Sequence, residues 1–105
     1  MTLGQKQRKF AKMVQELLEF IHNSGYEVTF GHAYRSPEEA KRLGFSKSLH
    51  TKKLAIDLNL FKHENYLPKT EDHQKFGEFW ESIGGSWGGR FNDGNHYSLE
   101  HDGVR

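Results

Sequence analysis

The chain has 105 residues, a length that accommodates one hydrophobic core, so we expect residues 1–105 to form a single domain. Its formal net charge is +1, and its basic residues are scattered along the sequence. This pattern argues against a surface built for nucleic acid or for membrane binding, since both need clustered positive charge. The chain has no cysteine, which excludes disulfides and thiolate metal sites. Any metal site would therefore use His, Asp or Glu.

No apolar run of signal-peptide length follows the basic residues near the N-terminus. No segment approaches the roughly 20 apolar residues that a membrane-spanning helix requires. We therefore expect no membrane insertion, and a protein that stays in the cytoplasm of the cell that makes it until another factor releases it.

Apolar residues recur with the period of a helix from about Gln5 to Asn23, and Gly25 follows as a stop signal. A second amphipathic pattern, which lies after residue 70 and ends at Gly84, predicts another helix. Between these two helices, Ser36 as N-cap and Pro37 at the first helical position predict a short helix to about Leu43. The second pattern consists of Phe76, Phe79, Trp80 and Ile83.

Three segments are typical of β-strands: 26–35, 54–61 and 96–100. In the middle segment, Leu54, Ile56, Leu58 and Leu60 face one way and Asp57 faces the other. The same alternation places Val28, Phe30, His32 and Tyr34 of the first segment on an apolar face and Arg35 on the opposite face. In the third segment it separates Tyr97 and Leu99 from His96, Ser98 and Glu100.

These elements predict an α+β fold, in which a small antiparallel sheet has helices on its apolar face. The other face of such a sheet can remain open to solvent, and here it would gather Arg35, Asp57 and His96. The segment 45–53 is expected to be a loop that delivers His50 to the start of the middle strand. We expect 62–70 to be a turn or excursion, 86–91 to be a close-packed glycine-rich turn, and His63 and His73 to be surface residues.

Asp57 is unusual in mid-strand, because a buried carboxylate there needs a cation. His50 and His96 complete a set of two imidazoles and one carboxylate, which leaves a fourth coordination position open, as a catalytic zinc requires. Such a zinc would lower the pKa of a water molecule towards ~7. Asp93, three residues before His96, is placed to act as general acid–base. Arg35 is placed to stabilise the oxyanion or to bind a substrate carboxylate.

Two further residues lie near this set in the sequence. Glu100 is expected on the face of His96, where it would support an imidazole from outside the metal set. His101 is the weaker ligand candidate, because it points the other way if the strand continues.

The quoted residues also resemble a known family. The motifs Tyr34-Arg35-Ser36, Ser48-x-His50, Ala55-x-Asp57 and Asp93-x-x-His96 are together similar to those of the zinc D-alanyl-D-alanine carboxypeptidases and L-alanyl-D-glutamate endopeptidases, and most similar to the small phage endolysins among them. The resemblance extends from about Tyr26 to Glu100. One departure is Asp93, since many relatives have Glu as the catalytic carboxylate.

The resemblance implies a fold of the hedgehog/D-Ala-D-Ala peptidase type with the metal site on the open face of the sheet. It implies that His50, Asp57 and His96 bind Zn²⁺, that Asp93 and Arg35 are catalytic, and that the substrate is the peptidoglycan stem peptide. A monomer is expected, acting on the cell wall, in the periplasm, after release from the cytoplasm.

Two cleavage sites and one non-catalytic role remain open at this stage. Few residues are left for lids, so we expect an open groove that accepts peptide on both sides, which favours the internal L-Ala–D-Glu bond. The alternatives are a D-Ala-D-Ala carboxypeptidase or dipeptidase, and a zinc-stabilised cell-wall-binding domain. In the last case a fourth ligand such as His101 would close the metal site.

Overall fold

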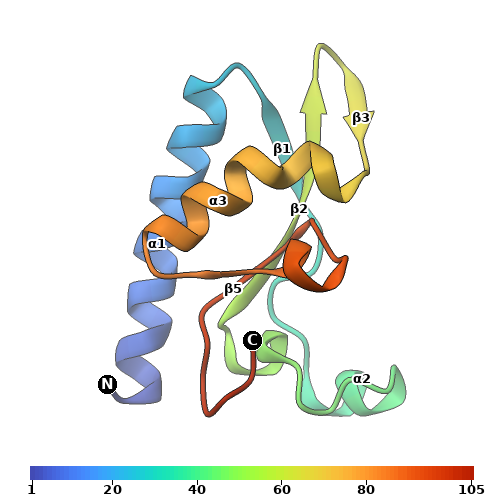
Figure 1. Ribbon diagram of the computed structural model, residues 1–105. Coiled ribbons are helices and arrows are strands. Elements are labelled where there is room, and N and C mark those ends of the chain that lie inside the picture. Colours follow the sequence, from blue (N-terminus) through green and yellow to red (C-terminus); the bar gives the residue numbers. More distant parts are fainter.

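Two helices pack against each other and against a small sheet in the computed structural model, which describes residues 1–105 (Figure 1). Helix α1 spans Leu3–Asn23, and α3 spans Gln74–Ser82. Thr2 and Gln5 form a reciprocal capping box at the start of α1. A short helix, α2 (Pro37–Arg42), has Ser36 as its N-cap, as the sequence predicts.

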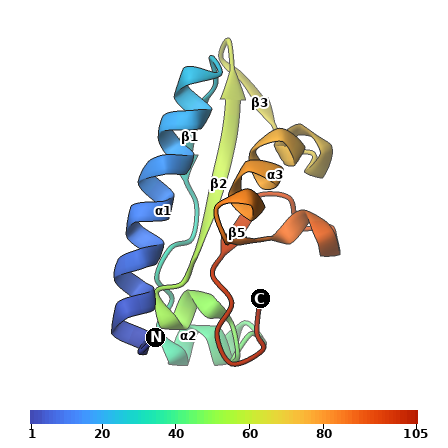
Figure 2. The same ribbon diagram turned by 60° about the vertical axis from the view of Figure 1, so that its left-hand side comes forward.

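The sheet is antiparallel, with the strand order β1-β2-β5-β4, and β3 also pairs with β2. Strand β2 (Ala55–Lys62) is the longest and runs along the length of the molecule (Figure 2). The predicted α+β class with a small antiparallel sheet is therefore confirmed. The other strands are β1 (Glu27–Phe30), β3 (Asn65–Leu67), β4 (Ser86–Trp87) and β5 (His96–Ser98).

The core lies between the two helices and the apolar face of the sheet. The Phe10 and Trp80 rings meet edge to face at 5.8 Å and join α1 to α3. Leu58 and Leu60 of β2 are fully buried, as the alternation in this segment predicts. Fully burying side chains of this size stabilises the fold by about 1.5–3 kcal/mol each. No helix combines the length and the apolar character needed to cross a bilayer.

The first strand is shorter than predicted, because a β-bulge interrupts it. The Gly31 N–H donates to the Asp57 carbonyl, whereas the Asp57 N–H donates to the His32 carbonyl, so two residues of one chain segment face one residue of β2. The extra residue breaks the alternation of faces assumed for 26–35. Tyr34, which follows the bulge, is 55% exposed, and Phe30, which precedes it and pairs with Leu58, is 62% exposed, so the prediction of both as core-facing residues is wrong.

Three other segments also differ from the sequence-based expectation. A 3₁₀ helix, Leu49–Lys52, occupies part of the predicted loop 45–53. The excursion 62–70 contains β3, which pairs with the end of β2. The third strand ends at Ser98 and does not reach Glu100.

Candidate metal centre

Strand pairing places Asp57 directly opposite His96. The two residues are register partners in the β2–β5 ladder, flanked by Ile56 opposite Tyr97. Since Ile56 and Tyr97 point into the core, Asp57 and His96 point away from it. The Nδ1 atom of His96 lies 3.2 Å from Oδ1 of Asp57.

His50 reaches the same carboxylate from the 3₁₀ helix that precedes β2. The Ser48 hydroxyl accepts the His50 N–H at 3.2 Å and starts this helix. The His50 ring then donates from Nδ1 to the Ala33 carbonyl at 2.8 Å, because a carbonyl oxygen can only accept. This hydrogen bond directs Nε2 to the Asp57 carboxylate, where it lies 3.3 Å from Oδ1. A carbonyl partner of this kind is the usual orienting contact of a metal-binding imidazole.

The three side chains fit a metal ion. Each offers one ligand atom, and these atoms lie within 4.8 Å of one another. The His50 and His96 rings are 5.2 Å apart, and both side chains are buried. With Nδ1 of His50 donating to Ala33, its Nε2 faces a carboxylate oxygen, so either a proton on Nε2 or a shared metal cation has to lie between these two atoms. Two imidazoles and one carboxylate are a donor set that suits zinc.

Asp57 is held in its ionised form. Burial alone would raise the pKa of its carboxyl group, but the hydrogen bonds and charge interactions with His50 and His96 outweigh it and hold that pKa well below its usual range. The centre therefore contains a permanent negative charge, which favours a divalent cation.

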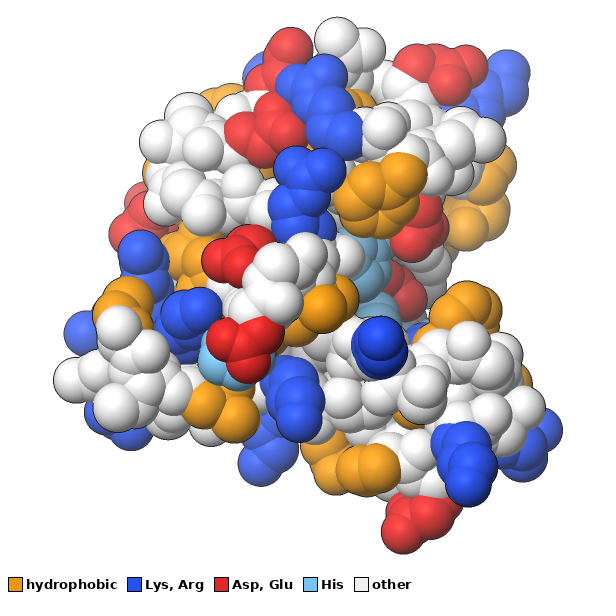
Figure 3. All heavy atoms as spheres, turned by 60° about the horizontal axis from the view of Figure 1, so that its bottom comes forward, with side chains coloured by type: hydrophobic (Ala, Val, Ile, Leu, Met, Phe, Trp, Pro, Cys, Tyr) orange, Lys and Arg blue, Asp and Glu red, His pale blue; other side chains and the backbone are white.

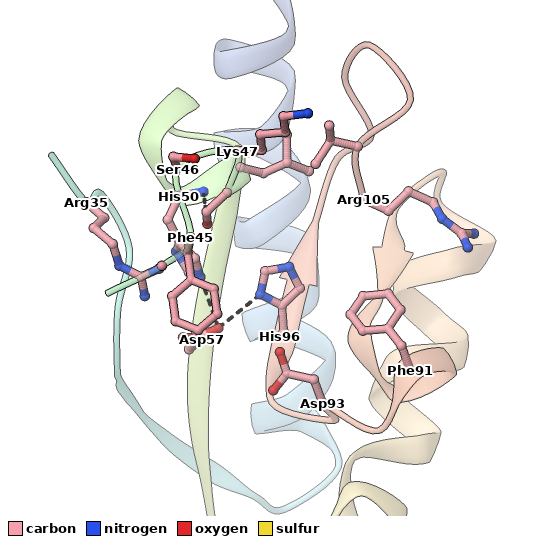
Figure 4. A pocket seen from close by; sticks show the side chains of 14 residues that line it. Arg35, Phe45, Ser46, Lys47, His50, Asp57, Phe91, Asp93, His96 and Arg105 are labelled. Atoms are coloured by element: carbon pink, nitrogen blue, oxygen red, sulfur yellow. Dashed lines mark hydrogen bonds and ion pairs between the residues drawn. The ribbon is translucent and has the colours of Figure 1, made fainter. Parts of the chain in front are cut away.

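A cavity of about 610 Å³ lies over these three residues. Figure 3 shows histidine and carboxylate atoms at the floor of a groove that opens to solvent. Asp93, which is exposed, lines the cavity beside His96 (Figure 4). The other lining residues are Arg35, Gly44, Phe45, Ser46, Lys47, Ser48, Leu49, Phe91, Val104 and Arg105.

Arg35 lies past the end of β1 and still reaches the cavity. Its backbone N–H donates to the His50 carbonyl at 3.1 Å, which ties it to the 3₁₀ helix. Its guanidinium carbon lies 5.7 Å from the centre of the Phe45 ring. Its Nε atom is buried and has no hydrogen-bond partner. A buried donor without a partner costs free energy.

The structure separates three other polar residues from the centre. The Glu100 carboxylate accepts the Gly103 N–H at 2.6 Å and does not support His96, so the expected role beside an imidazole is wrong. His101 contacts Lys6 and Asp102 and lies outside the group of three. His73, expected at the surface, is 1% exposed and shares a 2.8 Å hydrogen bond with Tyr97.

The sequence profile of a known family matches residues 43–99, and its description is D-alanyl-D-alanine carboxypeptidase. The chain belongs to this family. No curated protein matches the chain. Peptidases of the D-alanyl-D-alanine carboxypeptidase family depend on zinc and act on peptidoglycan peptides, and the three clustered side chains lie inside the matched segment.

Sequence patterns do not identify several of the residues that line the cavity of this family member. Phe45 and Phe91 are exposed aromatic side chains on its two sides (Figure 4). Arg105 lies outside the matched segment. The sequence does contain a signal for the turn before Arg105, because Asp102-Gly103 is a dipeptide typical of two-residue hairpin turns. This turn returns the chain towards the cavity.

Proposed function

We propose that the chain is a zinc-dependent endopeptidase, similar to phage endolysins, that hydrolyses the L-Ala–D-Glu bond of the peptidoglycan stem peptide. The observation that carries this choice is the open groove, in which lining residues lie on both sides of the three clustered residues (Figure 4). A peptide can therefore extend in both directions from the scissile bond. An enzyme that trims only a chain end needs a closed pocket on one side.

A lid over the groove would need a long chain segment near it, and two segments are candidates. The only sizeable excursion, 62–70, forms the β2–β3 hairpin at the end of the molecule opposite α2 (Figure 1). The segment before His50 is short and follows α2 directly. The excursion 62–70 does not line the groove, and the segment before His50 forms one of its sides, so neither closes it, which supports an internal cleavage site.

His50, Asp57 and His96 would hold the zinc ion in this mechanism. The chemistry that zinc supplies when bound is Lewis acidity, which activates water at neutral pH and polarises an amide carbonyl. Asp93 accepts the proton of the attacking water and delivers it to the leaving amine nitrogen. The Arg35 guanidinium donates hydrogen bonds to the scissile carbonyl oxygen as negative charge develops there.

The family description favours a second bond, the terminal D-Ala–D-Ala bond. Digestion of purified Gram-negative peptidoglycan followed by mass spectrometry distinguishes the two activities. We expect fragments that begin with a free D-Glu amine, and we expect them to form far more slowly with Asp93→Ala as the control. Release of D-Ala alone, with every L-Ala–D-Glu bond intact, would replace the endopeptidase by a carboxypeptidase.

A non-catalytic zinc-stabilised wall-binding domain is less consistent with the geometry. That role calls for a fourth protein ligand, and His101, the candidate for it, contacts Lys6 and Asp102 instead. Binding to peptidoglycan without any new amine terminus in the digest would support this role.

A further inference from the structure

Arg35 and Phe45 stand at the two ends of α2 and meet at the groove. Arg35 precedes the N-cap residue Ser36, and Phe45 follows Gly44, which ends the helix with a φ of 84°. The guanidinium carbon of Arg35 lies 5.7 Å from the centre of the Phe45 ring, and both residues line the cavity. Figure 4 shows the Arg35 side chain pointing towards this ring.

The backbone at the end of α2 determines where Phe45 stands. The Phe45 N–H donates to the Ala40 carbonyl at 2.7 Å, and the Gly44 N–H donates to the Lys41 carbonyl at 3.1 Å. These two hydrogen bonds form a Schellman motif, in which an apolar residue at the position of Phe45 often packs back onto the helix. The Phe45 side chain is nevertheless 58% exposed at the cavity. More than half of a large aromatic side chain is thus left uncovered in the groove.

Backbone hydrogen bonds also tie both residues to the segment that carries His50. The Arg35 N–H donates to the His50 carbonyl at 3.1 Å, and the Ser48 N–H donates to the Phe45 carbonyl at 2.9 Å. The Ser48 hydroxyl in turn accepts the His50 N–H. The Phe45 ring and the start of the Arg35 side chain are therefore both placed relative to His50.

Two groups attract the Arg35 guanidinium in different directions. The Phe45 ring attracts it through the negative face of its π system, and this ring lines the cavity. The Glu39 carboxylate of α2 attracts it through charge, and Glu39 does not line the cavity. Hydrogen bonding to Arg42 is the main cause of the lowered pKa of Glu39, and the charge of Arg35 lowers that pKa further. The ring therefore keeps the guanidinium at the groove, whereas the carboxylate draws it away.

We infer that Phe45 is a positioning residue whose ring holds the Arg35 guanidinium towards the scissile carbonyl oxygen. This inference rests on the proposed function, in which Arg35 donates hydrogen bonds to that oxygen. An arginine side chain has many rotamers, and stacking on an aromatic face restricts its planar guanidinium to few of them. Less conformational freedom is then lost when the transition state forms, so the contact should contribute to kcat.

A double-mutant cycle tests this role. Phe45→Leu keeps an apolar side chain but removes the π face, so we expect kcat to fall by about fivefold and KM to change by less than about twofold. Phe45→Tyr keeps the ring face and should retain most of kcat. In an Arg35→Ala background, Phe45→Leu should cause no further loss of kcat, because the group that it positions is absent.

Phe91→Leu is the matched control, since it makes the same change at an exposed ring on the far side of His96 (Figure 4). Its effect on kcat should be the same in the wild-type and Arg35→Ala backgrounds. The inference is overturned if Phe45→Leu lowers kcat equally in both backgrounds, because the ring would then act on the substrate itself. It is also overturned if Phe45→Tyr loses as much as Phe45→Leu.

Nitrogen-15 NMR of the arginine side chains tests the contact without turnover. The Nε–H signal of Arg35 in the zinc-loaded protein is assigned by its loss in Arg35→Lys. In Phe45→Leu this signal should lose its ring-current shift, and its order parameter should fall towards that of Arg8, an exposed arginine of α1. An unchanged order parameter overturns the inference. If the wild-type protein cleaves no L-Ala–D-Glu bond, the proposed function fails, and the NMR comparison still decides whether Phe45 holds the guanidinium.

Discussion

The indole N–H of Trp87 donates a buried 2.7 Å hydrogen bond to the carbonyl oxygen of Gly94, the residue that follows Asp93. From the other side, the Thr70 hydroxyl accepts the Gly94 N–H at 3.2 Å. The Asp93 N–H donates to the Gly88 carbonyl at 2.9 Å. The segment that carries Asp93 and His96 is thus held by three separate contacts, which fix two groups of the proposed mechanism relative to each other.

Trp87→Phe should lower both stability and turnover. The change keeps an aromatic ring but leaves the buried Gly94 carbonyl without its partner, which typically costs about 1–3 kcal/mol. We expect the free energy of unfolding to fall by that amount, and kcat to fall while the zinc content stays near one per chain. Urea unfolding, kinetics and elemental analysis measure the three quantities. Unchanged kcat in a destabilised protein would show that the hydrogen bond supports the fold but not Asp93.

Thr70 provides a matched pair of substitutions at the other contact. Thr70→Val is close to isosteric but removes the hydroxyl that accepts the Gly94 N–H, whereas Thr70→Ser keeps it. We expect Thr70→Val to lose about 1–2 kcal/mol of stability and part of kcat, and Thr70→Ser to retain most of both. A loss in Thr70→Ser with none in Thr70→Val would assign the effect to packing of the threonine methyl group, because valine keeps that group and serine lacks it.

The metal ligands and the proton carrier should respond differently to truncation. His50→Ala, Asp57→Ala and His96→Ala each remove one of three converging ligand atoms, so we expect each to lose most of its zinc. Asp93→Ala should keep zinc and fold, and should lose about 10²–10⁴-fold in rate. Elemental analysis and circular dichroism check these outcomes. Full zinc retention in His50→Ala and His96→Ala would exclude this centre, and loss of zinc in Asp93→Ala would make Asp93 a ligand.

The strand alternation explains why part of this centre can be predicted from the sequence. Asp57 stands between Ile56 and Leu58, and the same phase puts His96 next to Tyr97, so antiparallel pairing alone brings the two polar side chains to one face. The same reasoning predicts Arg35 on this face, but the alternation does not extend to Arg35, because the bulge at Gly31 shifts it. Gly31 is the sign of a bulge in this segment, since an isolated glycine inside a strand pattern often marks one, but the segment alone does not show how the partner strand pairs around it.

Tertiary contacts hide two other features from the sequence. The turn between β2 and β3 is formed by His63 and Glu64, which both have positive φ although neither is the glycine or asparagine that such turns prefer. The burial of His73 depends on Tyr97, 24 positions further along the chain. A polar residue in a polar segment gives no sign of that partner.

The burial of His73 makes stability depend on pH. Burial lowers its pKa from 6.5 to about 4, partly opposed by the charge of Asp72, so the folded protein keeps the imidazole neutral where the unfolded chain protonates it. Stability is therefore complete above pH 6.5 and falls as pH decreases towards 4, by at most the order of 3 kcal/mol. Below pH 4 this contribution no longer changes.

His73→Asn isolates this contribution, because the asparagine amide can still donate to Tyr97 but does not titrate. The variant should be less stable than the wild-type protein at pH 7, since it is smaller and leaves space in the core. Between pH 6.5 and 4 its free energy of unfolding should fall less steeply than that of the wild-type protein, so the two curves converge. Urea unfolding of the metal-free proteins at a series of pH values measures both curves. Parallel curves would show that another group causes the acid sensitivity.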